Sequence, residues 1–235
     1  MLISRDMRLI DAAKQKGFGT INKAAYYYDD YDFCLRELQD KPIRMLEIGV
    51  DDGGSLAAWK LYFPHAERIV GVDIDERCKK FTTDNVVVYI GDQSDASFLK
   101  ELSQKEGPFD LIVDDGGHTM NQQQTSFEVL FPLLKEDGIY VIEDLHTSYW
   151  PEFRDRYQTT MNFLHDRIED MHYWPAKHYR HYWSTLIRRI GRKFKKPIMP
   201  TNIYSEWIRR IFIGVSIAFI FKGKVERSYL IGDRF

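Results

Sequence analysis

The sequence has little cysteine and no long apolar run. Its two cysteines, Cys34 and Cys78, stand far apart and match no metal-binding or redox spacing, so a cytoplasmic location is the default expectation. Residues 1–17 contain no apolar core of signal-peptide length. The most apolar stretch, 211–221, is too short to span a bilayer, which takes about 20 apolar residues. We therefore expect no transmembrane segment.

An excess of charge of one sign is also missing. The chain has 33 basic and 35 acidic residues, and its net charge of −2 gives no general attraction to nucleic acid, so we expect no nucleic-acid partner. Residues 173–196 are an exception, because they interleave aromatic and basic side chains. We favour a solvated helix face with an aromatic contact in a homo-oligomer over contact with a nucleotide sugar, a lipid-linked saccharide or an anionic membrane surface.

Short apolar runs alternate with helical patterns along the middle of the chain. The predicted strands are 43–50, 68–75, 86–92, 109–116 and 139–145. The predicted helices between them are 51–63, 76–84, 94–107 and 122–138. This alternation specifies an α/β protein with a doubly wound, mostly parallel sheet, in which ligands bind at the carboxyl ends of the strands.

The chain divides into four predicted parts. Residues 1–40 form a helical and aromatic N-terminal cap, and residues 41–150 form the Rossmann-like core. Residues 151–207 are helical, aromatic and basic, which indicates a lid or an oligomer insert. Residues 208–235 return to strand composition, and they divide at 214–216 into two short strands that would complete a seven-stranded sheet.

A glycine-rich turn follows the first predicted strand. Its pattern, Glu47-x-Gly49-x-x-x-Gly53-Gly-Ser55, lets the backbone turn sharply and directs the free N–H groups of the next helix at a ligand. The dinucleotide fingerprint fails because Asp51 stands where it needs a glycine. A carboxylate in the strand suits a ligand that carries an ammonium group, and this form of the motif is typical of S-adenosylmethionine (SAM) binding.

Further polar residues end the next two strands. Asp73 lies about 20 residues past the glycine turn, where a carboxylate can accept hydrogen bonds from ribose hydroxyls. Asp92 ends the third strand, within reach of an adenine amino group, and we place its neighbour Gln93 in the same pocket. A glycine turn alone is more often a plain loop, but three signals at successive strand ends favour an adenosyl ligand.

Carboxylates also end the fourth and fifth strands, where they would converge and repel each other unless a cation or a basic group lies among them. Oxygen ligands suit Mg²⁺ or another hard divalent cation, and we expect Asp115, Glu143 and Asp144 to bind it. Asp114 would instead face the ammonium group of SAM. His118 is a candidate general base, because its ordinary pKa lies near neutrality. The alternative is a plain turn with a surface histidine and a helix N-cap region.

Residues 113–150, with the motif EDLHTSYW, and residues 46–64 resemble the macrolide-sugar O-methyltransferases of the mycinamicin and macrocin type, which are related to the cephalosporin hydroxylases. The resemblance covers about 17–150 and resumes weakly at 208–224. It implies SAM- and Mg²⁺-dependent methyl transfer to a sugar hydroxyl of a glycosylated natural product or a polysaccharide. By position it implies metal ligands at Asp115, Glu143 and Asp144, a base at His118, and a SAM pocket at Glu47, Gly49, Asp73, Asp92 and Asp114.

The chain departs from the family pattern in three places. Gly117 stands for a serine, Gln122 stands for a frequent histidine, and residues 19–23 keep only part of a G-T-D-K motif, so substrate contacts from these positions are open. Two other functions remain alternatives: a hydroxylase-like relative on the same fold, and a non-catalytic SAM-binding subunit. A purely structural subunit has no need to keep mutually repelling carboxylates, which argues against the last.

Overall fold

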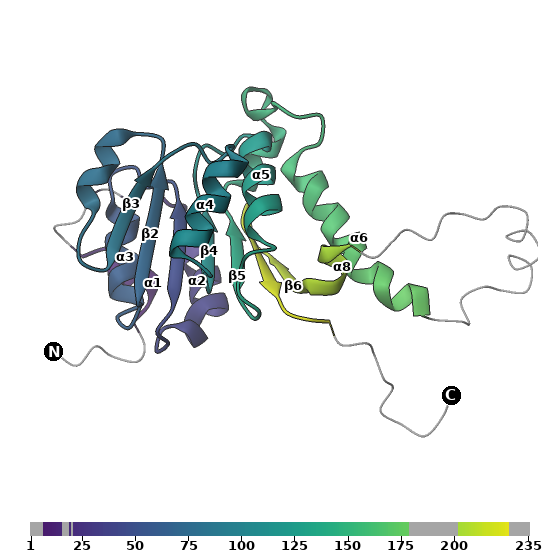
Figure 1. Ribbon diagram of the computed structural model, residues 1–235, viewed down its shortest axis with the longest axis horizontal. Helices are drawn as coiled ribbons and strands as arrows, with labels where there is room; N and C mark the ends of the chain where they lie inside the picture. Colours follow the sequence, from purple (N-terminus) through teal and green to yellow (C-terminus); the bar gives the residue numbers. More distant parts are fainter. Residues whose placement is uncertain (1–6, 16–18, 20, 179–201, 226–235) are drawn as a thin grey trace, which may run out of the picture.

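The computed structural model describes residues 7–15, 19, 21–178 and 202–225, and a seven-stranded sheet runs through them (Figure 1). Its strands are β1 (Arg44–Ile48), β2 (Arg68–Asp73), β3 (Val86–Ile90), β4 (Leu111–Asp114), β5 (Ile139–Ile142), β6 (Ile208–Ile213) and β7 (Ala218–Lys222). Their order across the sheet is β3-β2-β1-β4-β5-β7-β6.

The first five strands are parallel, whereas β7 pairs antiparallel with β5 and with β6. The chain moves outward from β1 to β3 on one side and from β4 to β5 on the other. The strand order therefore reverses between β1 and β4, and in such sheets the crevice at this reversal takes the ligand. The prediction of a doubly wound, mostly parallel, seven-stranded sheet is confirmed, including the two short strands on either side of 214–216.

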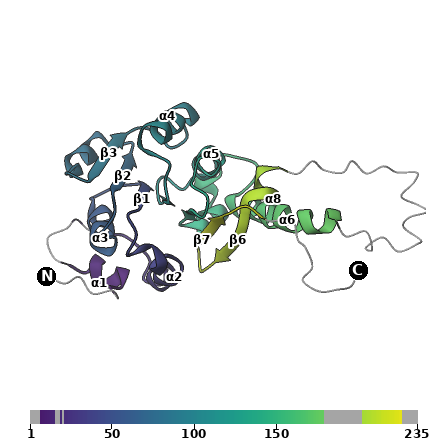
Figure 2. The same ribbon diagram turned by 60° about the horizontal axis from the view of Figure 1, so that its bottom comes forward.

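Helices cover both faces of the sheet (Figure 2). On one face lie α1 (Leu9–Ala13), α2 (Tyr27–Leu35) and α3 (Gly54–Tyr62). On the other lie α4 (Ala96–Glu106), α5 (Met120–Leu130), α6 (Thr160–His178) and α8 (Ile203–Trp207). Because both faces are covered, alternate residues of a central strand enter two different cores: Met45 packs toward α3 and Leu46 toward the α4–α5 layer.

Helices α4 and α5 begin at polar residues whose side chains accept hydrogen bonds from their free N–H groups. Asp95 accepts hydrogen bonds from the backbone of Ser97 and Phe98 at the start of α4. Thr119 and Gln122 form a reciprocal capping box at the start of α5. Helix α5 ends at Leu130, earlier than the predicted helix over 122–138. A 3₁₀ helix, Glu76–Phe81, replaces the predicted α-helix at 76–84, and two more 3₁₀ helices, Leu145–Tyr149 and Pro151–Phe153, follow β5.

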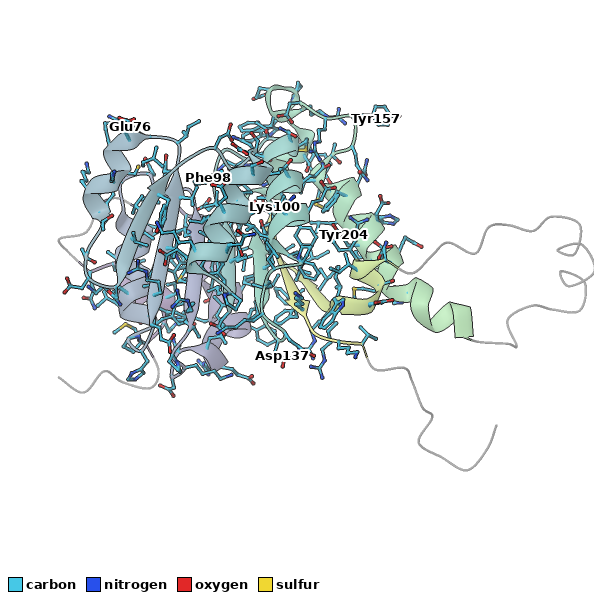
Figure 3. The ribbon with its side chains drawn as sticks, viewed as in Figure 1. Glu76, Phe98, Lys100, Asp137, Tyr157 and Tyr204 are labelled. Atoms are coloured by element: carbon cyan, nitrogen blue, oxygen red, sulfur yellow. The ribbon has the colours of Figure 1, made fainter. Side chains whose placement is uncertain are left out.

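The described part of 151–207 belongs to the second helical layer. Phe163 and Leu164 of α6 are buried in the core beneath it. Tyr204 of α8 lies beside this layer in Figure 3, stacked on Phe127 of α5, with the Arg167 guanidinium 4.2 Å from its ring centroid. The whole of the aromatic and basic segment at 173–196, for which we expected a solvated helix face with an oligomer contact, lies outside the residues whose side chains are described.

Among the described residues, no helix is both long enough and apolar enough to cross a bilayer.

Candidate functional site

A cavity of about 420 Å³ opens at the carboxyl ends of β1, β2, β3 and β4. Eight of the twelve predicted site residues line it: Gly49, Ser55, Asp73, Asp92, Gln93, Asp115, His118 and Asp144. Glu47, Gly53, Asp114 and Glu143 lie outside this lining. The sheet therefore brings most of the predicted residues to one place, and the four exceptions support it from behind.

The glycine turn after β1 requires glycine for two reasons. Gly49 has φ +93°, and a Cβ there would lie 2.0 Å from the carbonyl oxygen of Asp115, so the loops after β1 and β4 touch through backbone. Gly53 has φ +73°, and a Cβ there would collide with the ring of Phe81. The turn thus places the N-terminus of α3 and its Ser55 against the cavity.

The two carboxylates expected to meet a nucleoside are fixed by local backbone. Asp73 Oδ2 accepts hydrogen bonds from the N–H groups of Val50 (2.8 Å) and Asp51 (3.1 Å), which ties β2 to the glycine turn. Asp92 Oδ1 accepts from the backbone N–H of Ser94 at 2.7 Å. Both side chains line the cavity, and backbone hydrogen bonds fix their geometry, which is the preorganisation that a binding site needs.

Glu47 lies behind the wall of the cavity. Its carboxylate accepts hydrogen bonds from Ser55 Oγ and from Trp59 Nε1, both at 2.8 Å, and it is completely buried. Burial raises the pKa of Glu47 to about 7, while the Lys23 ammonium opposes the rise. Of these residues, Ser55 lines the cavity, so Glu47 holds a residue of the lining in place.

Asp114 is likewise buried, on the α5 side of the sheet. Its carboxylate accepts hydrogen bonds from Gln93 Nε2 at 2.9 Å, from Tyr140, and from Ser126. Burial raises the pKa of Asp114 to about 6, and the hydrogen bonds of Ser126 and Gln93 act against that rise. Gln93 Oε1 in turn accepts the backbone N–H of Gly117 at 2.8 Å, so Asp114 contacts the His118 loop through Gln93.

His118 sits in this loop with φ +58°, a left-handed conformation that side chains other than glycine adopt uncommonly. Its carbonyl accepts a hydrogen bond from Thr147 Oγ1 at 3.1 Å. Its Nε2 lies 3.3 Å from Asp144 Oδ2, and its buried Nδ1 has no hydrogen-bond partner among the described residues. Strained backbone of this kind clusters at functional sites, and here it turns the imidazole toward the carboxylates.

Three side chains at this end of the cavity could hold a metal ion. Asp115, His118 and Asp144 each offer one ligand atom, and these atoms lie within 4.8 Å of one another. Two carboxylates fit a hard divalent cation, with water or an acceptor oxygen in the remaining positions. The residues present therefore fit the magnesium ion that the sequence predicted.

Asp144 is held by residues from both ends of the chain. It has φ +54°, and Tyr27 of α2 donates a hydrogen bond to its Oδ1 at 2.7 Å. The Tyr27 hydroxyl also lies 3.2 Å from the carbonyl oxygen of Ser216, in the turn between β6 and β7. Ser216 accepts the N–H of Leu145 at 2.9 Å, and its Oγ lies 2.6 Å from Nδ1 of His146. The turn between the last two strands thus fixes the backbone directly after Asp144.

Glu143 occupies a different environment from the other two expected metal ligands. It is buried, and it accepts hydrogen bonds from Tyr31 and, at 2.5 Å, from Lys23 Nζ. Burial and the negative charge of Asp115 raise the pKa of Glu143, and Lys23 opposes them. Its carboxylate lies outside the group formed by Asp115, His118 and Asp144, so its role as a ligand stays a prediction.

The sequence analysis missed Lys23 as a functional residue. Its ammonium bonds both Asp115 and Glu143, and it is the basic group that converging carboxylates require. Burial lowers the pKa of Lys23, but Asp115 and Glu143 raise it by more, so the net shift is well above its ordinary value. The signal was present, because repulsion among the carboxylates demands a cation and Lys23 ends the partial motif at 19–23.

Two departures from the family pattern lie side by side. A Cβ at Gly117 would come within 2.3 Å of the side-chain amide oxygen of Gln122, the residue that completes the capping box of α5. Glycine at 117 therefore makes room for glutamine at 122, and the two substitutions are structurally linked. Both residues line the cavity beside His118. His146 and Tyr149 of the EDLHTSYW motif lie outside its lining, and Tyr149 is 72% exposed.

Known proteins are similar to this chain in sequence and in fold. Residues 46–145 match the family described as a methyltransferase domain. An 8-demethyl-8-(2-methoxy-α-L-rhamnosyl)-tetracenomycin-C 3′-O-methyltransferase of Streptomyces olivaceus is 37% identical over 161 residues, 62% of this chain and 41% of that protein. Demethylmacrocin O-methyltransferase of Streptomyces fradiae is 40% identical over 135 residues, 54% of this chain and 34% of that protein.

A solved structure of the MycE methyltransferase from the mycinamycin biosynthetic pathway, in complex with Mg, SAH and mycinamycin VI, superposes with a TM-score of 0.75. It is 29% identical, and the match covers 94% of this chain and 55% of that one. The chain thus spans about half the length of this structure and less of the curated relatives. The chain has the class I methyltransferase fold, its residues 46–145 match a methyltransferase domain, and it resembles the sugar O-methyltransferases of macrolides and tetracenomycins.

Proposed function

We propose that this chain is a SAM-dependent, divalent-metal-dependent O-methyltransferase that acts on a sugar hydroxyl. One observation carries the proposal: a single cavity has the glycine turn with Asp73 and Asp92 at one end, and Asp115 with His118 at the other. A cofactor bound at the first end would present its reactive group to an acceptor at the second. The relatives that resemble this chain are named for methylating rhamnosyl or macrolide acceptors, which supports a sugar as the acceptor class.

The adenosyl end would recognise the cofactor by hydrogen bonds. Asp73, Asp92 and Gln93 line the cavity. Asp73 would accept hydrogen bonds from the ribose hydroxyls, and Asp92 and Gln93 would contact the adenine. Ser55 and the N–H groups at the start of α3 would meet the amino acid part, with Gly49 allowing close approach. Glu47 and Asp114 would not contact this ligand; they would position Ser55 and Gln93, which would.

The acidic end would hold a divalent cation and the acceptor. Asp115 and Asp144 are the candidate ligands that line the cavity, with Glu143 behind them. When bound, a divalent cation supplies a positive charge that lowers the pKa of an acceptor hydroxyl. Tyr27 would keep Asp144 in its orientation through the hydrogen bond to Oδ1.

His118 would be the general base. Its Nε2 faces the carboxylate cluster, within reach of a hydroxyl placed beside Asp115 and Asp144. His118 would take the hydroxyl proton, and the resulting imidazolium would lie next to the Asp144 carboxylate. The chain's other contribution is alignment, because fixing acceptor oxygen, methyl group and sulfur in one line removes most of the entropic cost of the reaction.

The proposal is tested first by titrating SAM into the purified chain in a calorimeter, with Mg²⁺ and then with a chelator. Micromolar binding justifies a screen of rhamnosylated and macrolide acceptors, in which mass spectrometry should detect one added methyl group that depends on Mg²⁺. The absence of SAM binding under both conditions would contradict the proposal.

A cytoplasmic location belongs to the same proposal, because Cys34 and Cys78 are both unpaired thiols. A homo-oligomer formed through part of 151–207 also remains proposed, and the mass of the purified protein in solution tests it.

A further inference from the structure

A segment from the N-terminal part of the chain crosses the carboxyl edge of the sheet and delivers a lysine to the acidic end of the cavity. A Cβ at Gly19 would collide with the backbone of Asp52, so the segment lies directly on the glycine turn. Ile21, Asn22 and Lys23 then line the cavity. The Lys23 side chain is only 4% exposed, which is unusual for a lysine and requires full pairing.

That pairing uses two carboxylates at once. Lys23 Nζ lies 2.5 Å from Glu143 Oε1 and also bonds Asp115 Oδ2. It lies 5.9 Å from the ring centroid of Tyr31, whose hydroxyl donates to Glu143 as well. Asp144 has other partners: it accepts a hydrogen bond from Tyr27 and contacts His118. Lys23 is therefore the counter-charge of Asp115 and Glu143.

A divalent cation bound by Asp115 would need the carboxylate that Lys23 already bonds. Asp115 Oδ2 already bonds an ammonium group, and a second cation within a few ångströms of that ammonium would be strongly repelled. The ammonium and the metal ion are thus competitors for the Asp115 carboxylate.

We propose that Lys23 is an internal competitor for the divalent cation, which must displace its ammonium from Asp115. The inference rests on the proposed function, since it concerns the metal of that site. Lys23 acts as a positioning residue: it keeps Asp115 and Glu143 in place before the metal arrives, and it weakens metal binding in return. The metal-free chain then has a stable site without a cluster of uncompensated buried carboxylates.

The test compares Mg²⁺ and Mn²⁺ binding by the full chain and by Lys23→Met, measured calorimetrically without SAM. Methionine keeps most of the length of the side chain and removes its charge. We expect the variant to bind the ion at least about tenfold more tightly, which corresponds to about 1.4 kcal/mol. In chelator its melting temperature should fall, because Asp115 and Glu143 lose their partner, and saturating Mn²⁺ should raise it by more than in the wild type.

Lys135→Met is the matched control, because Lys135 also pairs with a carboxylate, Asp110, but at a site outside the cavity lining. Its metal affinity should equal that of the wild type. Metal binding by Lys23→Met that is unchanged, weaker or undetectable overturns the proposal. A variant that binds the ion when the wild type does not supports it.

A second measurement serves if Lys23→Met fails to fold. Brief acetylation of the wild-type chain, followed by peptide mass spectrometry, should label Lys23 slowly in chelator and faster with Mn²⁺, because displacement frees the amine. Equal labelling overturns the proposal. A SAM titration run alongside separates the two ideas: lack of SAM binding contradicts the methyltransferase function, whereas the metal affinities decide the role of Lys23.

Discussion

Gln93 and Asp114 form a buried pair in which the side-chain amide of one donates to the carboxylate of the other across 2.9 Å. The free end of the same amide accepts the N–H of Gly117, next to His118. The pair therefore fixes the loop that carries the candidate base, from a position beneath it. Neither residue needs to touch an acceptor to influence the reaction.

Gln93→Leu should destabilise the protein and slow its reaction. Leucine leaves the buried Asp114 carboxylate without one donor, and a buried unsatisfied group costs about 1–3 kcal/mol. It also removes the acceptor of the Gly117 N–H. Urea unfolding measures the loss of stability. Gln158→Leu, which breaks an exposed hydrogen bond to Asp166, is the control and should change stability by about 0.5 kcal/mol or less. Equal effects of the two variants would contradict the structural role of Gln93.

His118→Asn should keep SAM binding and lose about 10²–10⁴ of the turnover rate, because general base catalysis contributes that range. Asparagine is chosen because it tolerates the left-handed backbone at this position better than alanine does. Calorimetry measures the SAM affinity, and single-turnover kinetics measures the methyl transfer step. A variant that transfers methyl groups at the wild-type rate would refute the assignment of His118 as base.

Tyr27→Phe should weaken the metal site without destroying it. The variant removes the hydroxyl that donates to Asp144 Oδ1, and losses of this kind typically cost 10–100-fold in metal affinity or activity. We expect the Mg²⁺ concentration for half-maximal activity to rise by about tenfold, with most activity regained at saturating Mg²⁺. Tyr26→Phe is the control, because Tyr26 is 48% exposed and precedes the helix. An unchanged Mg²⁺ requirement in Tyr27→Phe would show that this hydrogen bond does not position Asp144.

Glu47→Gln should change how stability depends on pH. Burial raises the pKa of Glu47 from 4.5 to about 7, so between these values the folded state binds more protons than the unfolded state. The contribution of Glu47 to stability is therefore greatest below about pH 4.5 and falls as pH rises toward 7. Glutamine cannot ionise, so the variant should gain stability relative to the wild type by about 3 kcal/mol at most between about pH 5 and pH 8.

Urea unfolding of both proteins across this pH range measures the difference. A gap between wild type and variant that stays constant with pH would show that Glu47 ionises in the folded state as readily as in the unfolded one.

The sheet and its cavity could be predicted because apolar runs of strand length alternate with helical patterns, and because polar residues follow each run. Position relative to the end of a strand also explains which site residues lie behind the cavity wall. Glu47 and Asp114 stand inside β1 and β4, where both faces are covered by helices, so their carboxylates are buried under α3 and α5. Gly49 and Asp115 come after the last strand residues, and they line the cavity.

The pairing of Lys23 could not be located in the same way. It depends on where a segment without regular structure crosses the edge of the sheet, and no periodic pattern encodes such a path. The left-handed backbone of His118 and Asp144 was also hidden, because these residue types do not require it. Tertiary contacts hold these two residues in place: Thr147 bonds the His118 carbonyl, and Tyr27 bonds the Asp144 carboxylate.

The turn at Ser216 has a consequence for the smallest unit that can work independently. The family match ends at residue 145, yet the acidic residues within 46–145 are held by Lys23, Tyr27 and Tyr31 before it and by Ser216 after it. A fragment cut to the matched boundaries would keep most of the adenosyl pocket and lose the support of its reactive end. In this fold, the proposed cofactor pocket is local in the sequence, whereas the proposed metal and base site depends on both flanks of the matched region.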